Sequence, residues 1–221
     1  MSSNQILSRL SREDFALLEP RLEAVDLPVR RRLETRKRRI DHVYFIEAGF
    51  ASVVANGTSK PGIEVGIIGR EGMTGLAVVL GHDRAQHETF IQLPGKGLRM
   101  SADSLRAAQD RSVSLHRGML RYANSFLMQT TTTALANGRS KVEERLARWL
   151  LMAHDRVDGD DLPLTHEFLG MMLGSPRPGV TLAVQALEKE GLIDAKRRSI
   201  TILDRKNLEK RANGAYVRLE G

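Results

Sequence analysis

The chain has 221 residues, which is too long for one small module and suits two domains. It contains no cysteine, which excludes disulfides, thiolate catalysis and cysteine-bound iron–sulfur clusters. Its formal net charge of +7 favours polyanionic partners. The sequence contains neither a run of about 18 apolar residues nor a basic-then-apolar leader, so we expect a soluble, cytoplasmic protein without a membrane partner.

The N-terminal half, residues 1–110, has the pattern of a β-domain. Residues 4–18 predict a short amphipathic helix, and residues 25–100 predict many short strands separated by glycine, proline and Asn-Gly turns. Asn56-Gly57 is a strong hairpin signal. Short strands at regular spacing are typical of an antiparallel sandwich or barrel, such as a jelly roll.

This half also contains two clusters of charged or polar residues whose pattern does not indicate one function. The basic runs at 30–32 and 36–39 hold much of the positive charge. They would either contact flanking DNA or, more commonly for such runs, form a solvated strand edge or loop. His82, Asp83, His87 and Glu88 match no strong zinc or iron template, so we expect a polar loop and no metal.

Residues 111–138 predict a long dimerisation helix followed by a hinge at Asn137-Gly138. The stretch 112–136 contains no proline, and side chains recur every three or four residues along one stripe, as in the seam of a two-stranded coiled coil. The alternative is a helix packed on its own domain. The stripe consists of Leu115, Met119, Tyr122, Phe126, Thr130 and Thr133.

The C-terminal part, residues 139–221, predicts a winged helix-turn-helix. Thr165 suits the N-cap of a short helix, Gly174 suits a tight turn, and a second helix follows from about 178 to 190. Two short strands, 192–195 and 199–203, flank a basic turn. We therefore expect an α+β protein with an N-terminal antiparallel β-roll, a long helix and a C-terminal winged helix.

The start of the second helix carries the side chains that suit base reading. A helix fits the DNA major groove and its first residues reach the base edges, where Arg can hold guanine and Gln adenine. Ser, Thr and basic groups suit phosphates. The alternative is a scaffolding wing on which Arg177 is merely solvated. The candidate DNA-binding residues are Ser175, Arg177, Thr181, Gln185, Lys196, Arg197 and Arg198, with Thr165 and His166 at the first helix.

Residues 140–204 resemble the C-terminal domain of the cyclic-AMP receptor protein/FNR (CRP/FNR) superfamily of bacterial transcription regulators. The similar stretches are VEERLARWLL, LPLTHEFLGMMLG, VTLAVQALEKEGLI and ITILD, together with Arg177. HVYFIEAGFASVV, IEVGIIGREGMTGL and ETFIQLPG are similar to the cyclic-nucleotide-binding β-roll of the same superfamily. The resemblance implies a homodimer joined through the long helix. It also implies that Arg177 reads guanine, and that Thr165 and Pro176 lie against phosphates.

The chain departs from this family's pattern at several contact positions. A base-contacting Glu of the family falls on Pro178, a second Arg on Leu182, and a wing Gly on Arg198, so we expect a different operator. The absence of cysteine excludes the iron–sulfur cluster of the FNR branch.

The nucleotide pocket departs further. The family's Gly-Glu-x-Gly turn reads Gly72-Met73-Thr74-Gly75 here, and its phosphate-binding Arg-Ser/Thr pair falls near Gln86-His87. A thioether accepts a ribose hydroxyl poorly and Gln cannot neutralise a phosphate, so cyclic AMP binding in the usual way is not expected. We expect no cofactor and an unknown effector. The degenerate pocket comprises Gly72, Met73, Gly75, Arg84, Gln86 and His87.

These patterns predict a transcription regulator that binds double-stranded DNA as a homodimer on a pseudo-palindromic operator, and that contacts RNA polymerase if it activates. No nucleophile motif or placed carboxylate pair indicates an enzyme. One alternative is a ligand-binding β-roll that signals through protein contacts made by the winged helix. A cupin-like metalloenzyme ranks last, because His82 and His87 fit its ligand set poorly.

Overall fold

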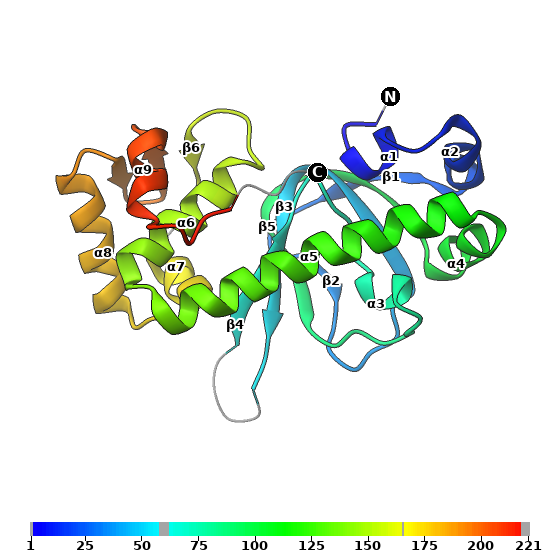
Figure 1. The fold of residues 1–221 in the computed structure, drawn as a ribbon, viewed down its shortest axis with the longest axis horizontal. Helices are drawn as coiled ribbons and strands as arrows, with labels where there is room; N and C mark the ends of the chain where they lie inside the picture. Colours follow the sequence, from blue (N-terminus) through cyan, green and yellow to red (C-terminus); the bar gives the residue numbers. More distant parts are fainter. Residues whose placement is uncertain (1, 58–61, 165, 218–221) are drawn as a thin grey trace. The chain divides into compact units, whose positions relative to one another are not determined.

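The computed structural model describes residues 2–57, 62–164 and 166–217, which fold into two compact units (Figure 1). Of the described residues, the roll unit comprises 2–55 and 66–128, and the winged unit comprises 56–57, 62–65, 129–164 and 166–217. The division falls inside the long helix α5, Val113–Arg139, which is continuous through both. The α+β class with an antiparallel roll and a winged helix is confirmed.

The roll unit is built on an antiparallel sheet with the order β1-β5-β3-β4, in which β2 also pairs with β5. Short helices precede the sheet and follow it. The elements are α1 Gln5–Ser8, α2 Arg12–Leu18, the 3-10 helix Glu19–Arg21, β1 Glu23–Leu27, β2 Arg32–Glu34, β3 His42–Ala55, β4 Ile63–Ile68, α3 Leu76–Val79, β5 Glu88–Ser101 and α4 Ala102–Arg111.

The two longest strands, β3 and β5, bend where glycines allow the backbones to come close. The register of the β3–β5 pair shifts between Ile46 and Ala51. A Cβ on Gly49 would lie 2.4 Å from the carbonyl oxygen of Leu93, and one on Gly95 would lie 2.0 Å from that of Ala48. Only glycine fits such contacts, so these two positions permit the irregular pairing that curves the strands.

The core of the roll unit includes one face of α5. Phe45 of β3 and Met73, which lies between β4 and α3, are fully buried in it. Leu115 and Met119 of α5 are both 0% exposed and pack into the same cluster. The long helix is therefore an integral part of this core in a single chain.

The winged unit contains the helix-turn-helix and hairpin that the sequence predicts, with boundaries shifted by one residue or two. A third, two-residue strand completes a sheet of order β6-β8-β7. The elements are α6 Val142–His154, β6 Asp161–Leu162, α7 His166–Leu173, α8 Arg177–Lys189, β7 Ile193–Lys196, β8 Ser199–Ile202 and α9 Arg205–Arg211.

None of the helices in the described ranges has the length and apolar character needed to cross a membrane.

Two glycines of similar backbone conformation provide a matched test of packing in the roll unit. Gly75 and Gly81 have φ of 83° and 84°. A Cβ on Gly75 would lie 2.3 Å from Cγ1 of the buried Val43, whereas none of the described atoms lies within 4 Å of one on Gly81. Gly81→Ala should therefore lower the free energy of unfolding by about 1 kcal/mol, from backbone strain alone. Gly75→Ala should lower it by about 3 kcal/mol, because overpacking adds to the same strain. Equal losses in urea unfolding followed by circular dichroism would contradict this account.

Candidate nucleic-acid interface

Helix α8 is held in the winged unit by its apolar face. Val180, Ala183, Val184 and Leu187 are buried and recur at helical spacing. The preceding turn contains Gly174, whose φ of 55° lies in the left-handed region that favours glycine. This turn separates α7 from α8 and leaves the opposite face of α8 open to solvent.

The open face of α8 carries the side chains proposed from the sequence, and one more. Arg177 is the first residue of the helix and is exposed, as is Gln185 two turns later. Thr181 is half-buried, and its hydroxyl donates to the carbonyl oxygen of Arg177 at 3.1 Å. Leu182 is 65% exposed on this face. In the sequence Leu182 stood out only as a departure from the family pattern and was not among the candidate contacts, because an isolated exposed leucine is common on protein surfaces.

The turn before α8 and the wing contribute further polar groups. Ser175 is half-buried in the turn, and Pro176 is the N-cap residue of α8 without a side-chain cap bond. In the wing, Lys196 forms an ion pair with Asp194 at 3.0 Å, and this bond raises the pKa of Lys196. Arg197 and Arg198 are exposed at the hairpin turn. Thr165 and the side chain of His166 lie outside the described residues.

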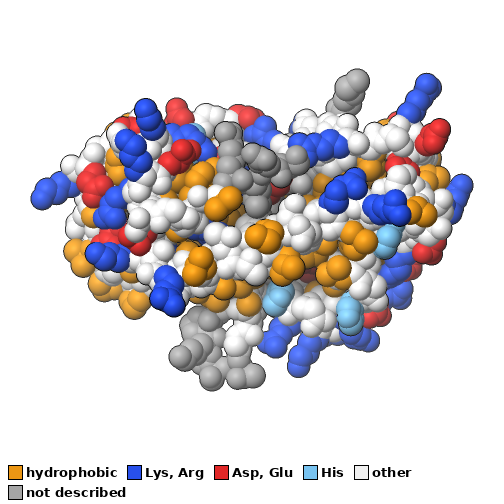
Figure 2. Space-filling view, viewed as in Figure 1, with side chains coloured by type: hydrophobic (Ala, Val, Ile, Leu, Met, Phe, Trp, Pro, Cys, Tyr) orange, Lys and Arg blue, Asp and Glu red, His pale blue; other side chains and the backbone are white. Residues whose placement is uncertain are grey.

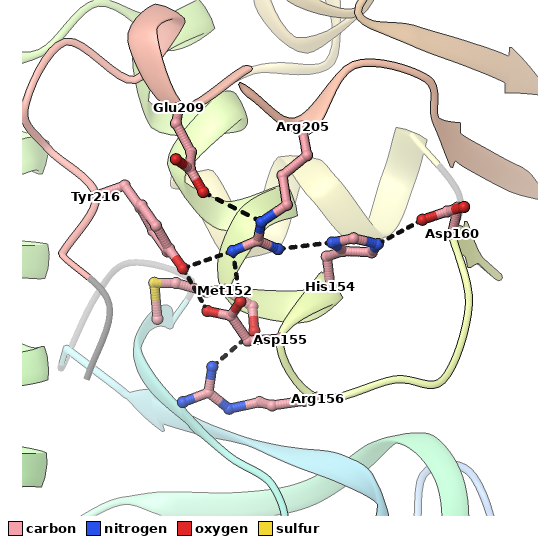
Figure 3. Close-up of polar contacts among 8 residues, drawn as sticks. All are labelled: Met152, His154, Asp155, Arg156, Asp160, Arg205, Glu209 and Tyr216. Carbon is pink, nitrogen blue, oxygen red and sulfur yellow. Dashed lines mark hydrogen bonds and ion pairs between the residues drawn. The ribbon is translucent and has the colours of Figure 1, made fainter. Parts of the chain in front are cut away.

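A polar cluster at the end of α6 joins α9 to the rest of the winged unit (Figure 3). The guanidinium of Arg205 donates to Asp155 Oδ1 at 2.7 Å and to the Tyr216 hydroxyl at 2.9 Å. Tyr216 in turn donates to Asp155 Oδ2 at 2.7 Å. Burial and this bond raise the pKa of Tyr216 to about 12.

The same cluster fixes the tautomer of His154. Arg205 Nη1 lies 2.7 Å from His154 Nδ1, and a guanidinium can only donate, so Nδ1 accepts. The proton of the neutral ring is then on Nε2, which lies 2.8 Å from Asp160 Oδ1. Sequence reasoning missed this cluster because its members are far apart in the chain and resemble ordinary surface charges.

The dimer seam expected on α5 is wrong in its choice of face. Leu115, Met119 and Phe126 are buried, as is Thr133, whose hydroxyl accepts from Arg148 Nη2 at 2.9 Å. Tyr122 is half-buried and donates to the carbonyl oxygen of Met73 at 2.7 Å. Thr130, the remaining member of the predicted seam, is also half-buried. A stripe that packs within its own chain cannot also pack on a partner.

The opposite side of α5 exposes a second apolar stripe, which we call the outer stripe. Val113, Leu120 and Leu127 recur at intervals of seven residues and are 67%, 39% and 57% exposed. Figure 2 shows hydrophobic side chains along the course that α5 takes in Figure 1. The spacing matches one position of a coiled-coil heptad.

The structure separates the six residues expected at the degenerate ligand pocket. Gly75, Gln86 and His87 line a cavity in the roll unit. Met73 is instead fully buried in the hydrophobic core, and a Cβ on Gly72 would lie 2.6 Å from the Tyr122 hydroxyl. Arg84 is exposed and donates to the carbonyl oxygen of Lys37 at 3.1 Å. Three of the six expected residues therefore line the cavity, and Arg84 is not among the described residues of its wall. Within the described ranges, no group of three or more acidic or histidine side chains is placed to hold a metal ion.

Comparison with known proteins agrees with this geometry. Residues 144–211 match the family model of the Crp-like helix-turn-helix domain. Three solved structures share the fold at 16% sequence identity. The TM-score is 0.75 for a Crp/Fnr-family protein from Eubacterium rectale, which covers 96% of this chain and 99% of its own. It is 0.74 for FixK2 from Bradyrhizobium japonicum, at 86% and 96% coverage. It is 0.70 for TTHB099, a CRP-family transcriptional regulator from Thermus thermophilus, at 90% and 98%. No curated protein matches the sequence.

The winged unit contains a Crp-like helix-turn-helix domain. The domain agrees with the resemblance of residues 140–204, and the whole chain shares the fold of these CRP/FNR-family structures. The Crp-like domain is the DNA-binding part of a transcription regulator. In helix-turn-helix domains generally, the second helix is the one that lies in the major groove.

The polar cluster provides a test of what holds the Crp-like domain together. Arg205→Met keeps the length of the stem but leaves His154 Nδ1 without its donor and removes one of the two hydrogen bonds that Asp155 accepts. We expect a loss of about 2 kcal/mol in the free energy of unfolding, below the range for a fully buried pair because these side chains are partly exposed. Urea unfolding followed by the fluorescence of Trp149, the single tryptophan, measures it. Lys206→Met, at an exposed neighbouring position, should have almost no effect. A similar loss in both variants would show that the cluster is not stabilising.

Proposed function

We propose that the protein is a sequence-specific transcription regulator that binds a pseudo-palindromic operator as a homodimer. The observation that carries this proposal is the open face of α8, where Arg177, Leu182 and Gln185 are exposed on a helix whose other face is fully packed. A basic wing follows the helix in the chain.

The three exposed side chains suit three different bases. Arg177 can hold guanine O6 and N7 with two bonds, and Gln185 can hold adenine N6 and N7. Leu182 has no hydrogen-bonding group, and an apolar side chain in the groove contacts the thymine methyl. From Arg177 to Gln185 the helix rises about 12 Å, which corresponds to about three or four base pairs.

Phosphate contacts would supply most of the affinity. Arg197 and Arg198 are exposed at the tip of the wing, whereas Lys196 already pairs with Asp194. We assign the strongest wing contacts to the two arginines, because Lys196 would have to give up its ion pair with Asp194 to bind a phosphate. Ser175 and Pro176, together with Thr165 and His166, remain proposed contacts at the start of the two helices.

The outer stripe of α5 is the proposed dimer interface. Val113, Leu120 and Leu127 place an apolar group at the same heptad position in three successive heptads, so two copies can pack side by side in parallel. A two-fold dimer of this class places its reading helices about 34 Å apart in successive major grooves. The operator then has two inverted half-sites. Contact with RNA polymerase remains a prediction for the case of activation.

Selection from a random DNA pool, with no added ligand, tests this proposal first, and a two-fold symmetric motif is the expected result. On the selected operator, Arg177→Ala should reduce discrimination at one guanine per half-site by about 1–3 kcal/mol, because its two bonds to that base are lost. Fluorescence anisotropy against operators changed at single positions measures this loss.

Two variants separate base reading from general affinity. Lys189→Ala, at the far end of α8, should leave discrimination unchanged. Arg197→Ala should weaken binding to all sequences alike and reduce the salt slope by about 1. Unchanged discrimination in Arg177→Ala would exclude α8 as the reading helix in the orientation proposed.

The dimer interface is tested by a charge in the outer stripe. Leu120→Glu with Leu127→Glu should give a monomer, because paired copies would bury four carboxylates. Sedimentation equilibrium measures the mass, and anisotropy should show a loss of binding to the full operator. Leu203→Glu changes a leucine that is 59% exposed in the winged unit and should remain dimeric. A dimer that persists in the double variant would place the interface elsewhere.

A further inference from the structure

The roll unit encloses a cavity of about 220 Å³ whose wall is mainly apolar. Strands, the short helix α3 and the long helix α5 contribute to it. Drug-sized ligands occupy pockets of about 300–1,000 Å³, so this cavity suits a smaller molecule. Its apolar wall includes Ile40, Val53, Ile68, Leu76, Ala77 and Phe126.

The charge of the wall excludes anionic ligands. No lysine or arginine is among the described residues that line the cavity. His87 lines it, but partial burial and the charge of Arg36 lower the pKa of His87, so its ring is neutral at neutral pH. A phosphate taken from water into such a site would lack a compensating cation, which makes its burial unfavourable.

One carboxyl group gives the cavity a polar anchor. Glu34 Oε1 accepts from the backbone N–H of Gly75 at 2.7 Å, and Oε2 accepts from the Thr89 hydroxyl. Burial raises the pKa of Glu34. A carboxylate oxygen can accept two hydrogen bonds, so Glu34, which lines the cavity, can also accept from a hydroxyl or N–H of a ligand. A cationic ligand is disfavoured because Arg36 lies close enough to act on His87.

We propose that this cavity binds a small uncharged molecule with an apolar body and a hydroxyl or N–H group that donates to Glu34. Gln86 and His87 are exposed at its edge and offer further hydrogen bonds there. Phenolic and indole compounds have this chemistry.

Ligand binding in this cavity would also affect α5, because two residues of that helix line the cavity. Tyr122 and Phe126 form the α5 part of the wall, four residues apart on the helix that carries the outer stripe. A ligand in the cavity therefore contacts the proposed dimer helix directly. Binding itself does not depend on the proposed DNA function; only its regulatory consequence does.

Ligand-observed fluorine NMR on the full-length protein tests the proposal. The probes are 4-fluorophenol, 5-fluoroindole and fluorobenzene, which lacks a donor. We expect saturable binding of the first two, weaker binding of fluorobenzene, and no displacement of any probe by cyclic AMP. Glu34→Gln should reduce the preference for 4-fluorophenol over fluorobenzene several-fold.

Cavity-filling variants locate the site. Ala77→Leu places three extra carbons in the cavity and should weaken probe binding at least tenfold, whereas Ala107→Leu makes the same change at an exposed position of α4 and should not. Leu80→Trp, at an exposed wall position, serves if Ala77→Leu does not fold. Failure of both donor probes to bind, displacement by cyclic AMP, or unchanged binding in the filled variants would overturn the proposal. Because DNA is absent from this assay, its outcome is independent of the operator selection.

Discussion

The burial of one face of α5 in the roll core is the constraint on which the other features depend. Leu115 and Met119 have no exposed surface, and each contributes roughly 2 kcal/mol of apolar burial. Because this face is committed to its own chain, only the outer stripe is left for a second copy. Because the same face ends in Tyr122 and Phe126, it also closes the cavity. One helix thus connects the core, the cavity and the proposed dimer contact.

The winged unit could be predicted closely from the sequence because its signals are local. The helix-turn-helix and hairpin form within 40 residues, with Gly174 and the apolar face of α8 marking the elements. Long-range polar contacts have no such signal. Arg205, Asp155 and Tyr216 are separated by up to 61 positions, and each alone has the composition of a solvated surface. Their joint role depends on the packing of α9 against α6.

The choice of the wrong stripe on α5 has a definite physical reason. Periodicity shows that a helix has an apolar face, but it does not show whether that face packs against the same chain or against a partner chain. Here the helix has two apolar faces, and the richer one packs on its own unit. Thr133 was predicted for the seam but is buried, where its hydroxyl accepts from Arg148. The outer stripe is narrower and interrupted by polar residues, such as Asn124 between two leucines, so it gave the weaker signal.

In the nucleotide-pocket turn, the residues that maintain the backbone differ from those that would contact a ligand, and the sequence is informative about both only in part. The turn Gly72–Gly75 keeps both glycines, since a Cβ on Gly72 would overlap the Tyr122 side chain and one on Gly75 would overlap the buried Val43. Met73, at the position of the family's carboxylate, packs into the core instead. The sequence therefore indicated the loss of nucleotide-binding groups, but not Glu34, which lies far from the turn in sequence and bonds Gly75. On α8, likewise, Leu182 stands where the family has an arginine while the buried face is complete. At both surfaces the side chains depart from the family pattern while the packed framework is complete. Fold similarity at 16% identity therefore tells us about the framework, whereas the ligand and the operator depend on the side chains.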